Sequence, residues 1–405
     1  MNSSKELLKN ETLDANNKVP EKSTPANYEI PFNWPYRTGR EIEYIAAAME
    51  SGHISGDGEF TLRCQKLLES ALGCKKVLLT TSCTHALEMA ALLLRLKPGD
   101  EVIVPSFTFV STVNAFVLRG ARPVFCDIDP HSLNLDVSMV SRLINPRTKA
   151  VVPVHYASMS CAMNDLLELT ENAGLQVVED NAQGLFGKYN NRYLGTFGSL
   201  ATVSFHETKN LQCGEGGALL INDPAMMERA EFLREKGTNR KNFFRGQVDK
   251  YTWVDIGSSY LPSDILAAHL LAQLEKKEEI FRLRKTIWTN YKEKLTPWAE
   301  ANGVTLSAIP DNCEPFYHLF YMLLKSENDR NHFITYMKER GILTTFHYLP
   351  LHLSPMGLKS GGKLGDCPVT EDISGRLVRL PFYNELSLAQ QNKVIEAIYE
   401  YEPTE

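Results

Sequence analysis

The stretch GSLATVSFHETKN, residues 198–210, is the strongest indication of the fold. Its apolar part, residues 200–205, has the length and the continuous apolar character of a strand that is buried on both faces. A polar turn follows this strand and presents Lys209. Upstream, a second apolar run, LQVVED at 175–180, ends in the carboxylate of Asp180. The pattern therefore predicts two buried strands that end in a lysine and an aspartate.

The same texture extends along the chain on both sides of this stretch. Apolar runs of strand length alternate with stretches that have the periodicity of amphipathic helices, which is typical of a parallel sheet covered on both faces. We therefore predict an α/β domain with a mostly parallel, seven-stranded sheet. The strand-like runs are 77–80, 101–105, 123–127, 150–155, 176–180, 201–205 and 218–221, and the helix-like stretches are 85–96, 111–118, 136–144 and 163–173.

The texture changes after about residue 262. A long, charged, helix-rich segment at 263–294 precedes short apolar runs at 316–324 and 342–346 and an amphipathic stretch at 388–399. This order of elements indicates a connecting helix that leads into a smaller α+β domain.

The chain divides into three predicted parts. Residues 1–28 mix Lys, Glu, Asn, Ser and Pro with few large apolar side chains, which predicts a disordered tail. Residues 29–262 are predicted to form the large domain, and residues 263–405 the connecting helix and the small domain. A chain of 405 residues is too long for one simple core, which agrees with this division.

Composition and charge argue against several classes of function. The net charge of −6 gives no reason to expect binding to nucleic acid or to anionic membrane. No apolar stretch is long enough to cross a membrane, and residues 1–18 lack the apolar core of a secretory signal. The eight cysteines are scattered without a CxxC pair, so we expect reduced thiols in a cytoplasmic protein and no metal site.

Ligands of open parallel sheets bind beyond the carboxyl ends of the strands, so residues that follow a strand are candidates for a site. Cys83 and Thr84 follow the first strand and begin a helix, where free amides and a hydroxyl would hold a phosphate. An ordinary Ser/Thr helix cap explains this segment as well. Phe109 follows the second strand and could stack on a flat heterocycle, or pack in the core together with Phe107.

Three further strand ends carry polar side chains. His155 could face a cofactor or a substrate, or be a satisfied core histidine. Asp180 could pair with a protonated ring nitrogen, and Gln183, one helical turn later, could reach a phenolic oxygen of the same ring. The alternative for Asp180 is a helix cap. Lys209 would ordinarily be solvated, but it stands between a buried strand and the glycines at 214–217, which let the backbone approach a ligand closely.

Lys209 and Asp180 together match the chemistry of pyridoxal phosphate (PLP). The lysine would form the Schiff base that holds the cofactor, and the aspartate would keep the pyridine nitrogen protonated so that the ring accepts electrons. Each candidate residue by itself also has an ordinary structural explanation. A chance coincidence would have to account for all of these residues following successive strands of one sheet.

Five motifs resemble the DegT/DnrJ/EryC1/StrS family of sugar aminotransferases: SCTHALEM at 82–89, PSFTFVST at 105–112, VEDNAQ at 178–183, SFHETKN at 204–210 and GEGG at 214–217. The likeness runs from about Ile30 to the end of the chain. It implies a PLP fold type I architecture, with pyridoxamine phosphate as the intermediate form of the cofactor. It also implies cofactor roles for Lys209 (Schiff base), Asp180 (pyridine nitrogen), Gln183 (ring oxygen), Phe109 (ring stacking), and Cys83, Thr84 and Ser204 (phosphate).

Within the family, four segments resemble the members that move an amino group from L-glutamate to C4 of a dTDP-linked 4-keto-6-deoxy sugar, giving dTDP-4-amino-4,6-dideoxygalactose for cell-surface polysaccharide. They are REKGTNR at 234–240, FFRGQVDKYTW at 243–253, DIGSSY at 255–260 and HYLPLH at 347–352. The resemblance implies a homodimer with shared active sites. Many members of the family carry Asn at a position where the neighbouring subunit contacts the phosphate. This chain has Ser258 and Ser259 there, and Ser259 is the candidate for that phosphate contact. The candidate substrate residues are His155, Arg240, Arg245, Lys250, Tyr251, Trp253, His347 and His352.

Two alternatives stay open at this point. A UDP- or GDP-linked keto sugar would require the same chemistry, and a regulatory or structural member of the family would keep the fold without turnover. The joint presence of Asp180, Gln183 and Lys209 argues against the second alternative. These residues set neither the nucleotide of the substrate nor the configuration of the new amine at C4.

Overall fold

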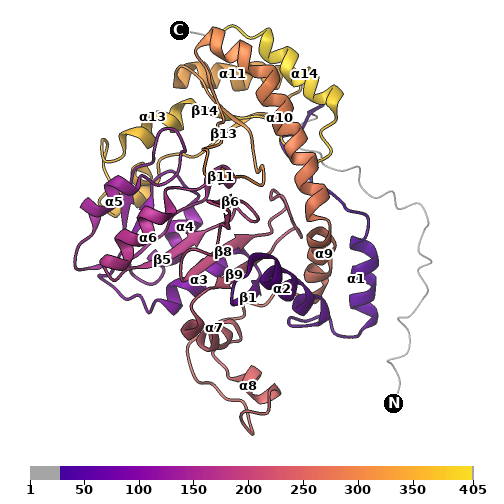
Figure 1. Ribbon diagram of the computed structural model, residues 1–405, viewed down its shortest axis with the longest axis vertical. Coiled ribbons are helices and arrows are strands. Elements are labelled where there is room, and N and C mark those ends of the chain that lie inside the picture. The colour runs from indigo at the N-terminus through magenta and orange to yellow at the C-terminus, as the bar shows by residue number, and fades with distance from the viewer. Residues whose placement is uncertain (1–27, 404–405) are drawn as a thin grey trace, which may run out of the picture.

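The computed structural model describes residues 28–403. The predicted disordered tail falls, apart from residue 28, on residues 1–27, which lie outside the described residues. Near the start of the described chain, the Ile30 amide donates to the Gly341 carbonyl, and the Ile30 side chain is fully buried in the C-terminal core. The N-terminal segment therefore packs against the C-terminal part of the molecule (Figure 1).

The central element is a seven-stranded sheet with the strand order β1-β9-β8-β5-β4-β2-β3 (Figure 1). Neighbouring strands are parallel except at β9, which is antiparallel to both β1 and β8. The predicted mostly parallel, seven-stranded sheet is confirmed. Its strands are β1 (Lys76–Thr80), β2 (Glu101–Pro105), β3 (Arg122–Cys126), β4 (Thr148–Val151), β5 (Gln176–Asp180), β8 (Leu200–Ser204) and β9 (Gly217–Ile221).

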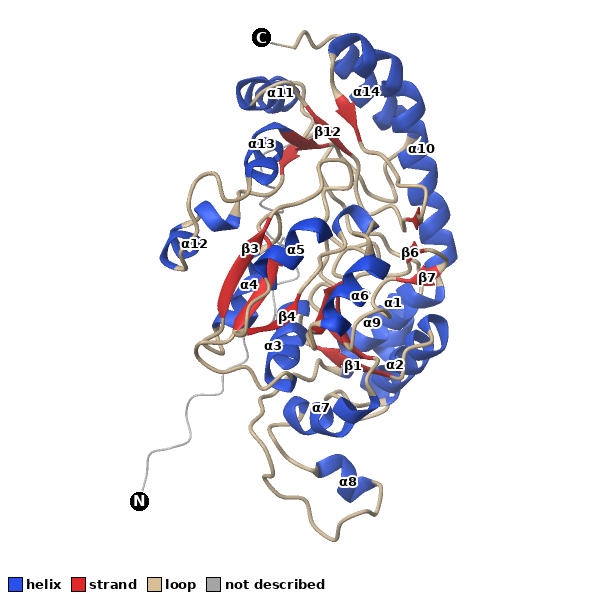
Figure 2. Ribbon diagram, turned by 60° about the vertical axis from the view of Figure 1, so that its left-hand side comes forward, coloured by secondary structure: helices blue, strands red, loops and turns tan. Residues whose placement is uncertain are grey.

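Helices cover both faces of this sheet, because successive apolar side chains of each strand point to opposite faces (Figure 2). In β1, Val77 and Leu79 belong to one buried core and Leu78 to the other. The helices of this part are α1 (Glu41–Glu50), α2 (Glu59–Leu72), α3 (Cys83–Leu93), α4 (Val110–Val117), α5 (Val137–Leu143), α6 (Met163–Asn172), α7 (Met227–Arg234), α8 (Arg240–Phe244) and α9 (Asp264–Glu275).

The C-terminal part has a core of its own beside an antiparallel sheet with the order β10-β12-β14-β13. A small sheet, β11-β6-β7, joins a hairpin of the large part to this region. The remaining elements are β6 (Lys188–Tyr189), β7 (Arg192–Tyr193), α10 (Lys277–Asn302), β10 (Thr305–Leu306), β11 (Cys313–Glu314), β12 (Tyr321–Leu323), α11 (Glu327–Glu339), β13 (Thr345–Phe346), α12 (Pro355–Lys359), α13 (Pro368–Arg376), β14 (Leu377–Arg379), α14 (Leu388–Tyr399) and three short 3-10 turns, Tyr156–Ser158, Pro224–Met226 and Leu351–Leu353.

The long helix expected over 263–294 is two helices. The chain leaves the helical conformation at Lys276, with ψ of 16°, and α10 then continues to Asn302. α9 buries Leu271 under the seven-stranded sheet, and α10 begins in the same core with Ile280 and continues to bury Tyr291 in the C-terminal core.

The strand-like runs of the C-terminal part are shorter than the sequence predicts. Over 316–324 the chain is extended only in β12, because Tyr317 adopts a left-handed backbone with φ of 52°. Over 342–346 only β13 pairs within the sheet. Within residues 28–403, no helix has the length and apolar character needed to cross a bilayer.

Candidate active site

A cavity of about 370 Å³ opens at the carboxyl edge of β5 and β8, between the seven-stranded sheet and the C-terminal part. The sheet side contributes the ends of its strands and the first turns of α3 and α4. All the predicted cofactor residues except Ser259 line this cavity: Cys83, Thr84, Phe109, Asp180, Gln183, Ser204 and Lys209.

Lys209 reaches the cavity from the loop between β8 and β9. Backbone hydrogen bonds close this loop, from the Phe205 amide to the Gly216 carbonyl at 2.8 Å and from the Glu207 amide to the Gly214 carbonyl at 2.9 Å. Burial lowers the pKa of Lys209, and the charge of Arg379 lowers it further, while Cys83 and Asp180 raise it. A lowered pKa increases the fraction of uncharged amine, which is the nucleophilic form.

Asp180 faces the cavity from the last position of β5. Its Oδ2 accepts a hydrogen bond from Thr112 Oγ1 at 2.7 Å, and its Oδ1 accepts one from the Ala182 amide at 3.1 Å. The preceding residue, Glu179, points to the opposite face of the sheet, as strand geometry requires. There its carboxylate accepts hydrogen bonds from three backbone amides, those of Gly195, Phe197 and Gly198, each at 2.7 Å.

The first turn of α3 is the predicted phosphate site. Ser82 caps the helix by accepting from the His85 amide, so the first amides of the helix, at Cys83 and Thr84, precede the intrahelical hydrogen bonds. A side chain at Gly217 would overlap the backbone of Ser82 and Cys83, so glycine lets β9 close against this turn. Burial raises the pKa of the Cys83 thiol and keeps it neutral.

Phe109 and Gln183 occupy different depths of the cavity. Phe109 is 58% exposed, whereas Phe107 is buried, so the core alternative holds for Phe107 and not for Phe109. Gln183 accepts from the Ala157 amide at 2.9 Å and donates to the Tyr348 hydroxyl at 3.0 Å. One amide hydrogen of Gln183 remains for another acceptor.

The C-terminal wall of the cavity contains polar side chains that sequence reasoning missed, apart from His347. Arg379, at the end of β14, donates from Nη2 to the Phe346 carbonyl at 3.0 Å, and its buried Nε has no partner in the described chain. No carboxylate of residues 28–403 forms an ion pair with it, and burial lowers its pKa. Its position in the sequence offers no signal, because only the tertiary fold brings β14 to the sheet edge.

Two histidines of this wall are neutral. His347 Nδ1 lies 3.1 Å from the Tyr156 hydroxyl, and His318 Nδ1 lies 2.8 Å from Asn210 Oδ1. Burial, together with nearby positive charges, lowers the pKa of both imidazoles well below the usual value. Nothing in the sequence around His318 distinguishes it from a core histidine.

Two of the candidate substrate residues, His155 and His352, do not line the cavity. Both imidazoles are fully buried outside the lining of the cavity. His155 Nε2 lies 2.7 Å from the Glu179 carboxylate, and His352 bridges Ser106, at 2.6 Å, and Glu371, at 2.9 Å. Both histidines have internal partners, which for His155 agrees with the core alternative.

The remaining candidates lie outside the cavity of a single chain. Arg245 forms two hydrogen bonds with the Glu231 carboxylate, and Arg240 pairs with Glu235 at 3.4 Å. These candidates lie on or just after the excursion that carries α8, residues 238–256, which projects from the molecule (Figure 1). They are Arg240, Arg245, Lys250, Tyr251, Trp253 and, just beyond it, Ser259.

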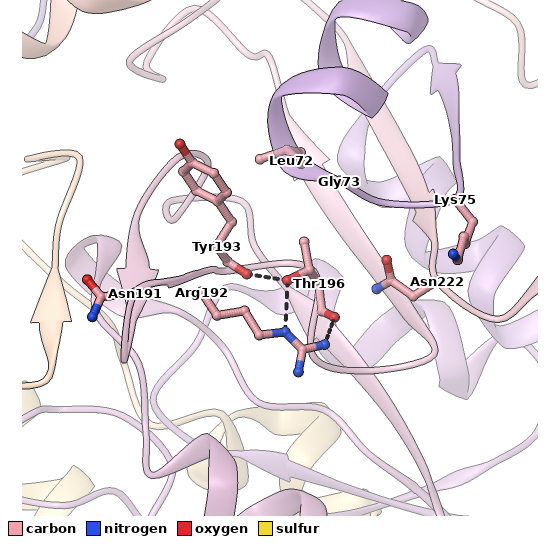
Figure 3. Close-up of a pocket in the computed structure, with 8 residues that line it drawn as sticks. All are labelled: Leu72, Gly73, Lys75, Asn191, Arg192, Tyr193, Thr196 and Asn222. Atoms are coloured by element: carbon pink, nitrogen blue, oxygen red, sulfur yellow. Dashed lines mark hydrogen bonds between the residues drawn. The ribbon is translucent and has the colours of Figure 1, made fainter.

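A second hollow of about 460 Å³ lies at the end of α2, beside the β6–β7 hairpin (Figure 3). The Arg192 guanidinium there is bonded to Thr196 of the same loop (Figure 3). No carboxylate, imidazole or thiol lines this hollow, whose titratable side chains are Lys75, Arg192 and Tyr193. Within residues 28–403 no group of three or more metal-ligating side chains gathers.

The chain is similar over nearly its whole length to known proteins. The model of the DegT/DnrJ/EryC1/StrS aminotransferase family matches residues 35–399. The chain is 32% identical to the spore coat polysaccharide biosynthesis protein SpsC of Bacillus subtilis, covering 92% of this chain and 97% of that protein. It is 30% identical to the GDP-perosamine synthase of Escherichia coli O157:H7, covering 92% and 98%.

Solved structures agree. The PLP form of the putative sugar aminotransferase Spr1654 from Streptococcus pneumoniae superposes with a TM-score of 0.85 at 25% identity, covering 92% of this chain and 98% of that one. The S. venezuelae DesV structure superposes with a TM-score of 0.83 at 29% identity, covering 92% and 98%. Lys209, Asp180 and the first turn of α3 are groups that fit PLP. This protein therefore belongs to the DegT/DnrJ/EryC1/StrS family of PLP-dependent sugar aminotransferases.

Proposed function

We propose that this enzyme transfers the amino group of L-glutamate to C4 of dTDP-4-keto-6-deoxy-D-glucose, giving dTDP-4-amino-4,6-dideoxy-D-galactose and 2-oxoglutarate. The observation that carries the transaminase reaction is that Lys209 and Asp180 line one cavity. PLP, when bound, supplies an electron sink for the carbanion that proton removal leaves. The reaction belongs to cell-surface polysaccharide biosynthesis in a reducing, cytoplasmic compartment, where eight free cysteines are stable.

Each residue of the sheet wall has a proposed role. Lys209 binds the cofactor covalently, and its amine, once displaced by the amino donor, moves a proton between the donor's α-carbon and the cofactor. Asp180 holds the proton on the ring nitrogen, and its bond to Thr112 keeps its carboxylate aimed at the ring. Cys83, Thr84 and Ser204 hold the phosphate, Phe109 covers the ring, and Gln183 contacts the ring oxygen.

The C-terminal wall suits anionic substrates. Arg379 is a half-buried cation that forms no ion pair within the described chain, and such a charge is stabilised by an anionic ligand. Glutamate and a nucleotide sugar both supply anions. His347, which lines the same wall, is a candidate to contact the sugar.

We further propose a homodimer in which the excursion at 238–256 reaches the partner's cavity. Trp253 is 77% exposed and Tyr251 is 54% exposed in the single chain, and large exposed aromatic side chains mark interaction surfaces. Arg240, Arg245, Lys250 and Ser259 would approach the partner's cavity with them. Sedimentation at micromolar concentration should give a dimer for the wild type, and Trp253→Ala should weaken it; a monomeric wild type contradicts this proposal.

The nucleotide defines the second candidate function. A relative from Saccharopolyspora spinosa, 33% identical, is a 4-aminotransferase of a dTDP-linked sugar, but the relative from Escherichia coli is a GDP-perosamine synthase. A GDP- or UDP-linked keto sugar is therefore the alternative substrate.

Incubation with dTDP-4-keto-6-deoxyglucose and glutamate tests the proposal. NMR coupling constants of the product should show an axial amine at C4. An equatorial amine contradicts the galactose product, and turnover with only the GDP- or UDP-linked sugar contradicts the dTDP substrate. Lys209→Ala should lose both the visible absorbance of the bound cofactor and all amino transfer; retained turnover in this variant excludes the scheme.

A further inference from the structure

The turn that carries His318 is held by a buried guanidinium. Arg284 donates from Nε to the Tyr317 carbonyl at 2.7 Å, from Nη2 to the His318 carbonyl at 2.6 Å, and from Nη1 to Asn384 at 3.0 Å. Tyr317 adopts φ of 52°, a conformation that a non-glycine residue rarely takes without compensation. The fold therefore constrains the backbone that places His318 in the cavity.

Asn210 determines which nitrogen of His318 carries the proton. Asn210 Nδ2 donates to the Phe316 carbonyl at 2.7 Å, which directs Asn210 Oδ1 toward the imidazole. An amide oxygen is only an acceptor, so the hydrogen bond at 2.8 Å requires a proton on His318 Nδ1. In a neutral imidazole, Nε2 then carries a lone pair and no proton.

The surroundings of His318 keep it neutral. Lys209, Arg284 and Arg379 face it with positive charge, His347 beside it is neutral, and no carboxylate of residues 28–403 pairs with it. Its pKa lies well below the usual value because of burial first and these cations second. The lone pair of Nε2 therefore persists at neutral pH.

His318, which carries this acceptor, and Lys209 contribute to the same two hollows. His318 and Lys209 both line the main cavity, and both line the small hollow that adjoins it beside Gln183, Ser204 and Asn210. The lysine amine has two hydrogens and one lone pair, so a hydrogen bond through one hydrogen leaves the lone pair free to act as a base. A neutral acceptor that cannot become charged orients this amine without competing for the proton.

We propose that His318 is a positioning residue for Lys209, and that Asn210 makes it one by fixing the imidazole with Nε2 as a permanent acceptor. The inference rests on the proposed function in one respect, because it assumes that Lys209 moves the donor's α-proton. It names no new proton carrier, since His318 accepts a hydrogen bond and never the proton itself.

Histidine NMR tests the fixed tautomer without turnover. In the ¹⁵N-histidine-labelled protein, with and without PLP, the signal that disappears in His318→Gln should have the shifts of a neutral ring protonated at Nδ1. It should not titrate between about pH 5.5 and 9. A ring protonated at Nε2, or a ring that becomes charged in this range, overturns the proposal.

Kinetics of the first half-reaction test the positioning role. Loss of the cofactor band with L-glutamate alone should slow about 10-fold in His318→Leu, the scale of one lost hydrogen bond, and His318→Gln should recover most of the rate because its carbonyl oxygen restores the acceptor. With α-deuterated glutamate, His318→Leu should show a larger primary isotope effect than the wild type. Equal losses in both variants with an unchanged isotope effect overturn the proposal.

The Asn210→Asp variant provides a further test, in which the pH dependence of the half-reaction is measured. A carboxylate beside Nδ1 should raise the pKa of His318, so the ring becomes a cation that donates from Nε2 at low pH. The half-reaction should then be slowed at pH 7 and recover as the pH rises through the new pKa, whereas a profile of unchanged shape overturns the proposal. The surface variant His332→Gln is the matched control. All arms need only the amino donor, so a wrong sugar substrate leaves these tests intact.

Discussion

The two walls of the cavity are built in different ways. On the sheet wall, Asp180 and Cys83 lie at the end of a strand and at the start of a helix, where regular secondary structure places them. On the C-terminal wall, Arg379 ends strand β14, but His318 lies in a turn that is held by contacts with Arg284 and Asn210, which are far apart from it in sequence. In the proposed function, the sheet wall binds the cofactor and the C-terminal wall contacts the substrates.

The largest effect should come from the sheet wall. Asp180→Asn removes the negative charge that stabilises a protonated ring nitrogen, and we expect kcat to fall by about 1000-fold or more, or roughly 4 kcal/mol. Steady-state assays with saturating PLP measure it. Thr112→Val, which removes only the hydrogen bond to the same carboxylate, should cost about 10-fold. Equal losses in both variants would mean that the aspartate acts through structure alone.

A variant of the opposite wall should separate the two substrates. Arg379→Gln removes the cation, and if the donor's carboxylate binds there, the glutamate concentration for half-maximal loss of the cofactor band should rise about 10- to 100-fold. The second half-reaction, with pyridoxamine phosphate enzyme and keto sugar, should change little. Arg376→Gln, which removes a cation paired with Asp372 outside the cavity, is the control. A selective loss of the second half-reaction would instead place the diphosphate at Arg379.

Substitution of the two carboxylates that contact the buried histidines, Glu179 and Glu371, should lower the stability of the protein to different extents. Glu179→Gln places an amide NH₂ against the buried Gly195 amide and His155, and we expect a loss of about 2–4 kcal/mol. Glu371→Gln, at the partly exposed partner of His352, should cost about 1 kcal/mol. Differential scanning calorimetry of both variants at the same pH compares them. A Glu371→Gln variant as unstable as Glu179→Gln would show that both walls depend equally on buried ion pairs.

The smallest effect concerns the pH dependence of the apoprotein. Because burial lowers the pKa of Lys209, its charged form is disfavoured in the fold, and Lys209→Met should stabilise the apoprotein at pH 7 by about 1 kcal/mol. The pKa of Lys209 is lower in the folded than in the unfolded protein, so the wild type becomes more stable as the pH rises between these two values. The stability advantage of Lys209→Met over the wild type should therefore shrink as the pH rises toward the usual lysine pKa. Thermal unfolding from pH 7 to 10 measures it, with Lys97→Met as the exposed control. A constant difference at every pH contradicts the explanation.

Much of the sheet wall was predictable because its residues follow local rules. Apolar runs of four to six residues predicted the seven strands, and the residue that ends a parallel strand necessarily lies at the ligand edge. Thr112, which supports Asp180, lies within the motif PSFTFVST in the first turn of α4, and a hydroxyl at the start of the helix that follows a strand is the signal that could have singled it out.

Other expectations could not have been corrected from sequence. His155 and His352 follow strands or stand in motifs as a functional histidine would, and only burial against Glu179 and Glu371 shows that they are internal supports. The helix break at Lys276 has no local marker such as glycine or proline in the sequence.

The sequence by itself determined the parallel sheet, the order of its strand ends and the pairing of a lysine with an aspartate at one edge. Hydrophobic periodicity and strand geometry act over a few residues and are therefore readable in the chain. The tertiary structure alone decided that His318, Tyr348 and Arg379 close the cavity, and that Asn210 sets the tautomer of His318. These placements depend on distance-sensitive hydrogen bonds between segments that meet only after the two cores have packed.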